Sequence, residues 1–211
     1  MLHELRTYTF RAGQAAGAAK NSGTIARDIR GDDYGKLEGY WLPEVGPLNQ
    51  VMHLWSYESF EHREERRKAL SQNERWTKEY LPLMRPIILR QDIRLLNPMV
   101  GINPPVDPKN IYEFRHYRLQ VGAMKRWSGL FTEALTVREK YSKIVGLWST
   151  EAGQPNEVCH IWAYKDFEAR MKARTAASQD PGWQAFLKEG GPLIEEMNSV
   201  VMLPAAHSPL Q

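Results

Sequence analysis

Two histidines at matching positions of this 211-residue chain have the side chains best suited to acid–base chemistry. His53 lies in the run Asn49–Tyr57 (Asn-Gln-Val-Met-His-Leu-Trp-Ser-Tyr), and His160 lies in Asn156–Tyr164 (Asn-Glu-Val-Cys-His-Ile-Trp-Ala-Tyr). Because histidine titrates near neutral pH, both are candidate catalytic acids or bases. The two runs align position by position without a gap, which indicates two structural copies of one unit.

A second polar set repeats near the start of each copy. The run Glu4-Leu5-Arg6-Thr7-Tyr8 returns as Glu113-Phe114-Arg115-His116-Tyr117. Alternate side chains of a strand share one face, so the glutamate, arginine and tyrosine of each copy lie together. Arginine can hold an anionic group, and tyrosine can donate a hydrogen bond. With the repeated tryptophans added, the candidate ligand-binding residues are Arg6, Tyr8, Trp41, Trp55, Arg115, Tyr117, Trp148 and Trp162.

Each of these residues also has a purely structural interpretation. Glu4 and Arg6 can neutralise each other on the strand face, and a strand histidine can simply satisfy a buried carbonyl. The tryptophans, Trp41 and Trp148 among them, are large aromatics that fill the core of a duplicated fold well. The sequence leaves the functional and the structural interpretation open.

The elements that position these residues follow from the changing hydrophobic period. The first copy is predicted to have strands at 2–10, 37–42, 50–57 and 87–96, with helices at 14–30 and from Ser59; the second has strands at 111–119, 144–149, 157–164 and 194–203, with helices at 123–141, from Asp166 and from Asp180. The order β-α-β-β-α-β is the ferredoxin-like arrangement, and the fold class is α+β. Two such sheets can pack their open faces into one α+β barrel, a pseudo-dimer in one chain.

The chain therefore divides into a first unit at residues 1–98, a linker at 99–109 and a second unit at 110–211. The stretch from Pro98 to Pro108 contains four prolines. Because proline interrupts both helices and strand ladders, we expect a stiff connector between the units.

The third strand of each copy carries two alternating sets of side chains. In the first copy they are Val51, His53, Trp55 and Tyr57 on one face, and Met52, Leu54 and Ser56 on the other. Because the smaller set suits close packing against helices, we expect the larger set to face the barrel interior, with Arg6 and Arg115 beside it. Apolar walls with a few convergent polar groups are the usual form of a small-molecule site.

Composition and motifs argue against several functions. The formal charge of +3 is dispersed, so binding to nucleic acid gets little support. The sequence has no phosphate loop, no Ser-His-Asp signature and no metal-ligand spacing, so no metal or cofactor is predicted. No apolar run reaches the roughly 18 residues of a membrane span. The single Cys159 has no partner, which favours a reducing compartment. We expect a soluble, cytoplasmic protein.

Several of these motifs resemble the NIPSNAP family: Glu4-Leu5-Arg6-Thr7-Tyr8, Gly39-Tyr40-Trp41, and the run from Glu44 to Val51 followed by His53-Leu54-Trp55-Ser56-Tyr57. The likeness covers essentially the whole chain as two tandem units. It implies the dimeric α/β-barrel fold, which small antibiotic-type monooxygenases, haem-degrading enzymes and isomerases share. It implies no particular reaction, because one fold hosts unrelated chemistries. The second copy has Gly153-Gln154-Pro155 in place of Gly46-Pro47-Leu48, so a ligand contact made by that turn can exist on one side only.

Three functions are compatible with these features. The first is binding of a small organic ligand in the barrel interior. The second is a cofactor-free enzyme of the monooxygenase or isomerase type, with His53 and His160 as acid and base. The third is a protein-interaction module with a filled barrel, and association into a homo-oligomer is compatible with all three. A cavity that contains His53 or His160 and opens to solvent favours the first two.

Overall fold

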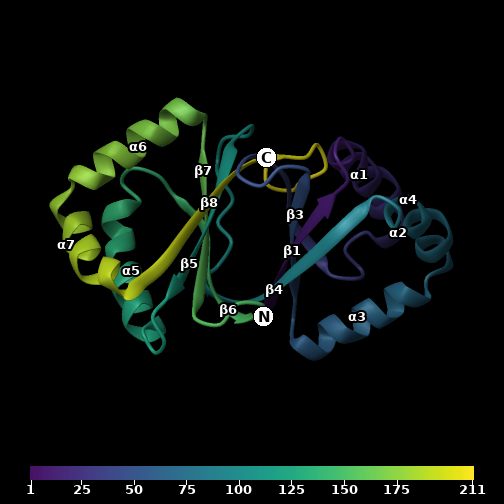
Figure 1. The fold of residues 1–211 in the computed structure, drawn as a ribbon, viewed down its shortest axis with the longest axis horizontal. Coiled ribbons are helices and arrows are strands. Elements are labelled where there is room, and N and C mark those ends of the chain that lie inside the picture. Colours follow the sequence, from purple (N-terminus) through teal and green to yellow (C-terminus); the bar gives the residue numbers. More distant parts are fainter.

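The computed structural model describes residues 1–211 and has a central set of strands with one helical layer on each side (Figure 1). The first copy contains β1 (Leu2–Phe10), α1 (Ala15–Asn21), the π-helix η1 (Ser22–Ala26), α2 (Arg27–Arg30), β2 (Lys36–Val45), β3 (Gln50–Tyr57), α3 (Phe60–Gln72), the π-helix η2 (Trp76–Tyr80), α4 (Leu81–Met84) and β4 (Ile88–Val100). The second contains β5 (Ile111–Leu119), α5 (Met124–Arg138), β6 (Ile144–Ala152), β7 (Glu157–Tyr164), α6 (Phe167–Gln179), α7 (Pro181–Gly190), the short 3-10 helix η3 (Gly191–Leu193) and β8 (Ile194–Pro204).

All eight strands form one closed barrel in the order β1-β3-β2-β8-β5-β7-β6-β4. Each copy contributes a ferredoxin-like sheet, and the pairs β2 with β8 and β4 with β6 join the two sheets. The predicted α+β barrel, a pseudo-dimer in one chain, is confirmed. Because closure gives every strand two partners, no strand edge is free for a further copy to join.

The asparagine of each repeated motif has a backbone role. Asn49 and Asn156 adopt φ angles of 54° and 58°, in the left-handed region that asparagine tolerates better than most residues. Their carbonyl oxygens accept hydrogen bonds of 2.8 Å from the backbone of Phe10 and Leu119. This contact ties the hairpin turn to the end of the first strand and fixes where β3 and β7 begin.

Side-chain caps set the start of the long outer helices. The side chains of Ser59 and Asp166 accept hydrogen bonds from the backbone N–H of His62 and Ala169, as N-cap residues do. Asp180 caps α7 in the same way, with Pro181 at the first helical position. These caps satisfy backbone N–H groups in the first turn and fix where each helix begins.

The barrel interior is filled by the smaller set of third-strand side chains, so the predicted direction of that strand is wrong. Met52 and Leu54 form one buried cluster with Cys159 and Ile161 of the other half. The cluster also contains Trp41 and Trp148, both fully buried. An eight-stranded barrel is just wide enough for side chains to fill, and these residues pack its middle. A second cavity, of about 520 Å³, lies beside this cluster between strands of both halves, and its lining includes Thr7, His116 and Glu157.

The larger set faces the helices of its own half. Trp55 and Tyr57 pack in a second cluster with Ala18 and Ala26 of the first helical layer. In the second half Trp162 packs in the same way on the residues of α5. His53 and His160 therefore lie outside the barrel, between sheet and helices, and they share no common interior.

The repeated Gly-x-Trp motif explains how the barrel holds two tryptophans. A Cβ atom added to Gly39 would lie 2.0 Å from the ring of Trp41, and one added to Gly146 would lie 2.3 Å from the ring of Trp148. Each ring thus covers the glycine two residues earlier on the same strand face. Only glycine leaves space for the indole.

Strand β4 extends further than expected. The sequence predicted that it ends near 96 and that a linker begins at 99, but the ladder passes through Pro98 and ends at Val100, paired with β6. The register shifts between Pro98 and Val100, which accommodates a residue that cannot donate a ladder hydrogen bond. No helix is long and apolar enough to cross a membrane.

Candidate functional site

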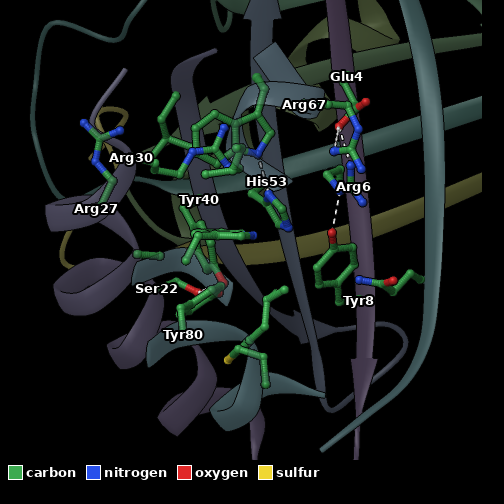
Figure 2. Close-up of a pocket in the computed structure, with 18 of the residues that line it drawn as sticks. Glu4, Arg6, Tyr8, Ser22, Arg27, Arg30, Tyr40, His53, Arg67 and Tyr80 are labelled. Atoms are coloured by element: carbon green, nitrogen blue, oxygen red, sulfur yellow. Dashed lines mark hydrogen bonds and ion pairs between the residues drawn. The ribbon is translucent and has the colours of Figure 1, made fainter. Parts of the chain in front are cut away.

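A cavity of about 350 Å³ lies in the first half, between the outer face of its sheet and its helices (Figure 2). Its walls come from β1, β2, β3 and β4 on one side and from η1, α2, α3, η2 and α4 on the other. Half of its 24 lining residues are hydrophobic, and the rest include five arginines, two histidines and several hydroxyl groups. The cavity thus combines apolar walls with several hydrogen-bond donors.

The structure brings only part of the predicted set to this cavity. Arg6, Tyr8, His53 and Trp55 line it. Trp41 and Trp148 do not, because both lie in the barrel core. The corresponding residues of the second half lie on the equivalent face of their own sheet, away from the cavity: Arg115, Tyr117, His160 and Trp162.

Sequence reasoning missed most of the helical side of the cavity. On the helices these residues are Ser22, Arg27, Arg30, Arg67, Trp76 and Tyr80, and Tyr40 of β2 and His207 after β8 were missed as well. Ser22 and Tyr80 fall inside the two π-helices, where the alignment of the two copies shifts. The change in spacing between the aligned residues of the two copies was therefore the sequence signal that could have pointed to these residues.

Glu4 is the fully buried centre of an ion cluster beside the cavity. Arg6 Nη1 lies 2.7 Å from its carboxylate, Arg63 of α3 also binds it, and Arg67 lies at 3.8 Å. Burial alone would raise the pKa of Glu4, but the arginines hold it below its usual value. Arg6 Nε also donates to the hydroxyl of Tyr8.

The second half repeats this cluster around Glu113. Arg115 lies 2.6 Å and Arg170 2.8 Å from the carboxylate, with Arg174 at 3.8 Å. In each half the cluster joins the first strand to the outer helix, since Glu4 of β1 binds Arg63 of α3 and Glu113 of β5 binds Arg170 of α6. The structural interpretation of the Glu-Arg pair accounts for this part of the motif.

The ring of His53 is fixed by Trp55. The indole Nε1–H donates to His53 Nδ1 at 2.5 Å, so in the neutral ring the proton is on Nε2. The ring stacks on Tyr40 at 5.1 Å and meets Tyr8 edge-on at 4.9 Å. Burial, together with the nearby charges of Arg6 and Arg30, lowers the pKa of His53 well below 6.5. Figure 2 shows the ring between the two tyrosines.

Arg30 lies over the ring of Trp55, with its guanidinium carbon 3.6 Å from the ring centroid. One terminal nitrogen donates to the carbonyl of Tyr34 at 2.8 Å, whereas Nε is buried without a hydrogen-bond partner. Burial lowers the pKa of this guanidinium below its usual value, although the nearby Tyr57 opposes the shift. No carboxylate lies within ion-pair distance of it.

A chain of hydroxyl groups lies at the other end of the cavity. Ser22 Oγ lies 2.8 Å from the hydroxyl of Tyr80 and accepts a hydrogen bond of 3.1 Å from Tyr40. Burial raises the pKa of Tyr80 to about 12. Both phenols are therefore neutral hydrogen-bonding groups at physiological pH.

In the second half, aromatic rings occupy the equivalent space. When Arg6 is aligned with Arg115, Trp127 and Phe131 stand where the first half has Ala18 and Ser22. The two rings stack at 4.7 Å, and Phe131 also packs on Phe186 at 5.5 Å. His160 lies against Phe131 at 5.3 Å, and its Nε2 is buried without a partner.

The first π-helix, η1, accounts for one shift in the alignment of the copies. The alignment that matches Ser22 with Phe131 would place Arg30 opposite Glu139, but the residue equivalent to Arg30 is Arg138, one position earlier. Arg138 lies over Trp162 as Arg30 lies over Trp55. The first copy therefore has one additional residue between these points, inside η1.

The second π-helix, η2, has the same effect. Trp76 aligns with Trp183, and Tyr80 aligns with Phe186. Trp76 and Tyr80 are four positions apart along the chain, whereas Trp183 and Phe186 are three apart, so the first copy has one additional residue here. Each π turn contains one additional residue, and such turns are frequent at functional sites. Both widen the helical layer at the cavity, and α5 and α7 of the second half run without them.

Residues at the end of the second copy close the cavity of the first. The backbone N–H of Ala205 donates to the carbonyl of Tyr40 at 2.9 Å, and Tyr40 N–H donates to Ser208 at 3.0 Å. Between these contacts His207 lies on the ring of Tyr40 at 4.5 Å and against Gly23 of η1. The site thus contains one residue from the other half.

Comparison with known proteins places this geometry in a family. Human NipSnap homolog 2 is 34% identical over 178 residues, which cover 83% of this chain and 62% of that protein, so this chain spans less than two thirds of its relative. Two solved bacterial structures share the fold at low identity. Both come from proteins proposed to be monooxygenases, one of Lactobacillus acidophilus (TM-score 0.70, 10% identity, 97% and 94% of the two chains) and one of Fusobacterium nucleatum (TM-score 0.72, 8%, 97% and 92%). The NIPSNAP family model matches residues 3–100 and again 112–209, and the chain therefore belongs to the NIPSNAP family as two tandem units.

Proposed function

We propose that this protein binds a small organic molecule in the cavity of its first half, and that its second half serves as the structural counterpart. One observation carries the proposal. At the position where the second half packs Trp127, Phe131 and Phe186 into a solid layer, the first half has a cavity of about 350 Å³. Unfilled volume costs stability compared with a packed core, so a retained cavity argues for an occupant.

The size and lining of the cavity support this function. A volume near 350 Å³ falls at the lower end of the range for pockets that bind drug-sized molecules. Trp55, Trp76 and Met84 offer apolar contact, and His53 and the hydroxyls offer a few oriented polar groups. We place the ligand in this sheet–helix layer rather than in the barrel interior, because the cavity of about 520 Å³ beside the barrel cluster has few hydrophobic lining residues. Self-association, where it occurs, would use the helical layers, since all strand edges are paired.

A cofactor-free enzyme is the second candidate, and the orientation of His53 favours it. With Nδ1 engaged by Trp55, the ring presents Nε2–H, a donor suited to an oxyanion rather than a base that removes protons. His160 has the same bond to Trp162, at 2.6 Å, but its Nε2 is enclosed by aromatic rings. Of the two histidines predicted as acid and base, we propose that His53 alone acts on a ligand.

The interaction-module alternative required a solid interior. The middle of the barrel is packed, but a cavity of about 520 Å³ lies next to that packed cluster, and the cavity with His53 lies outside the barrel. This arrangement favours ligand binding.

The test compares cavity-filling variants with a matched control. Ser22→Phe installs the residue of the second half, Ala26→Leu fills a neighbouring position, and Ser22→Ala removes the hydroxyl without adding volume. The readouts are native mass spectrometry of any copurified compound and fluorescence of the neutral naphthalene dye PRODAN. We expect binding by the wild type and by Ser22→Ala, and at least a tenfold weaker affinity in both filling variants. Undiminished dye binding in folded Ser22→Phe and Ala26→Leu, or no binding to the wild type, would contradict the proposal.

A further inference from the structure

We infer that the occupant of this cavity is an organic anion, a compact hydrocarbon body with one carboxylate-type head group held between Arg30 and His53. The inference rests on the proposed function and adds the chemical class of the ligand. It follows from the balance of charges and donors around the cavity, from the hydrogen bonding of Arg30, and from the orientation of His53.

The charges that line the cavity do not balance. Five arginines line it against a single carboxylate, Glu4. That carboxylate is already shared by Arg6, Arg63 and Arg67. Arg27 has its own partner, Asp32, at 2.7 Å. The cavity therefore has an excess of positive charge, and that excess includes Arg30.

Arg30 has one buried nitrogen, Nε, that no protein group accepts a hydrogen bond from. A guanidinium in a low-dielectric position is costly unless paired. The counterpart Arg138 donates to Ser142 at 2.7 Å and to the hydroxyl of Tyr164 at 3.3 Å. Arg30 has contacts of the same kind, to the carbonyl of Tyr34 and to Tyr57, but its buried Nε–H is left for an anion.

His53 adds a second donor that lines the cavity. Trp55 connects the two groups, since it carries Arg30 on its face and donates to His53 Nδ1 from its edge. The remaining Nε2–H has no partner in the protein, and the imidazole lines the cavity. A neutral imidazole donor next to a guanidinium matches a carboxylate oxygen, and it does not match a cationic head group.

The rest of the cavity is suited to a hydrocarbon body. Leu70, Trp76, Met84 and Ile88 line it without charge. Aromatic and flexible apolar side chains of this kind accept planar or branched carbon skeletons by area burial rather than by directed bonds. The ligand class is therefore an amphipathic organic acid.

The test uses two probes of equal size, 2-naphthoate and 2-naphthamide, which differ in charge. Calorimetric titration of the wild-type protein is expected to give at least a tenfold tighter affinity for the acid. Arg30→Met, which keeps the length of the side chain, should reduce that preference to about twofold or less, while Arg30→Lys keeps part of it. The matched variant Arg138→Met in the second half should leave the preference unchanged.

The outcomes separate the two proposals. Equal affinity of the wild type for both probes overturns the anion inference and leaves ligand binding in place. A preference that persists in folded Arg30→Met overturns the role of Arg30. Absence of any binding to the wild type, by either probe and by PRODAN, overturns the proposed function itself and this inference with it.

Discussion

The hydroxyl of Ser22 lies 2.8 Å from the phenol of Tyr80, whereas the corresponding residues of the second half, Phe131 and Phe186, pack ring to ring at 5.5 Å. One pair of positions thus forms a polar cavity wall in the first copy and a solid aromatic core in the second. The difference is produced by side-chain size and by one additional residue in each of two helices. The two halves contribute equivalent sheets to the barrel, and this difference lies in the helical layers that cover them.

Removing the additional residue of η1 should close the cavity. Deletion of the exposed Thr24 lets the π turn relax to regular α-helical hydrogen bonding, as in α5. We expect PRODAN affinity to fall about tenfold or more while the thermal midpoint is retained. The control is deletion of Thr132 from α5, which turns the following apolar face by about 100° and should destabilise the fold by at least about 3 kcal/mol. Equal destabilisation by both deletions would show that η1 is not a removable insertion.

The glycines beneath the barrel tryptophans should not tolerate a methyl group. Gly39→Ala and Gly146→Ala place Cβ 2.0 Å and 2.3 Å from an indole ring, so we expect each to cost about 1–3 kcal/mol by overpacking. Gly17→Ala and Gly129→Ala are matched controls in helices, with open space around the added Cβ. These controls should stabilise the protein by roughly 0.5–1 kcal/mol. Urea unfolding of the four variants measures the contrast, and neutral values for the strand pair would disprove the packing argument.

The buried Glu113 cluster should make stability depend on acid pH. Burial opposes ionisation, but the hydrogen bond from Arg170 and the charge of Arg115 lower the pKa of Glu113 to about 2. The folded pKa lies below the unfolded value of about 4.3, so the stabilisation is complete above that value and is lost as pH falls toward 2.

The variant Glu113→Gln tests this dependence. It should cost about 3–5 kcal/mol at pH 7, because it leaves buried arginines unpaired, and much less near pH 2. Urea unfolding across this range checks the result, with the exposed Glu133→Gln as the control. A cost that stays constant with pH would exclude the ion cluster as its source.

The imidazole of His53 should stay neutral through the physiological range. Its pKa is lowered well below 6.5 by burial and by the arginines nearby, and the indole of Trp55 fixes the proton on Nε2. Nitrogen-15 NMR of the ring from pH 5.5 to 8 should show one neutral tautomer and no titration. In Trp55→Phe the donor is lost, and we expect a mixture of tautomers. A titration midpoint near 6.5 in the wild-type protein would rule out this assignment.

The architecture was predictable because both copies repeat the same periodicity and turn residues. The strands at 2–10, 50–57, 111–119 and 157–164 were predicted with the observed bounds. The direction of β3 was not, because both faces of that strand are buried and alternation alone cannot say which face meets helices. Small residues in α1 and η1, such as Ala18 and Ala26, leave room for Trp55 on that side.

Other parts of the site could not be predicted from periodicity or motifs in the sequence. The contribution of His207 depends on a chain crossing between residues far apart in sequence, such as Tyr40 and Ser208, and no local period encodes it. The unmet hydrogen bond of Arg30 is visible only by comparison with Arg138 in three dimensions. The shift in the alignment of the copies was present in the sequence, but a π turn and a simple deletion produce the same shift.

Tandem linkage of the two units has a consequence for how such a site can change. In a symmetric pair of identical chains, every substitution appears twice, so enlarging one pocket also hollows its twin and doubles the loss of packing. Here the two positions are encoded separately. Rings such as Trp127 and Phe131 can keep the second half well packed while the first half loses packing and gains a cavity. His207 of the second half can contact the first half without any equivalent contact in the opposite direction.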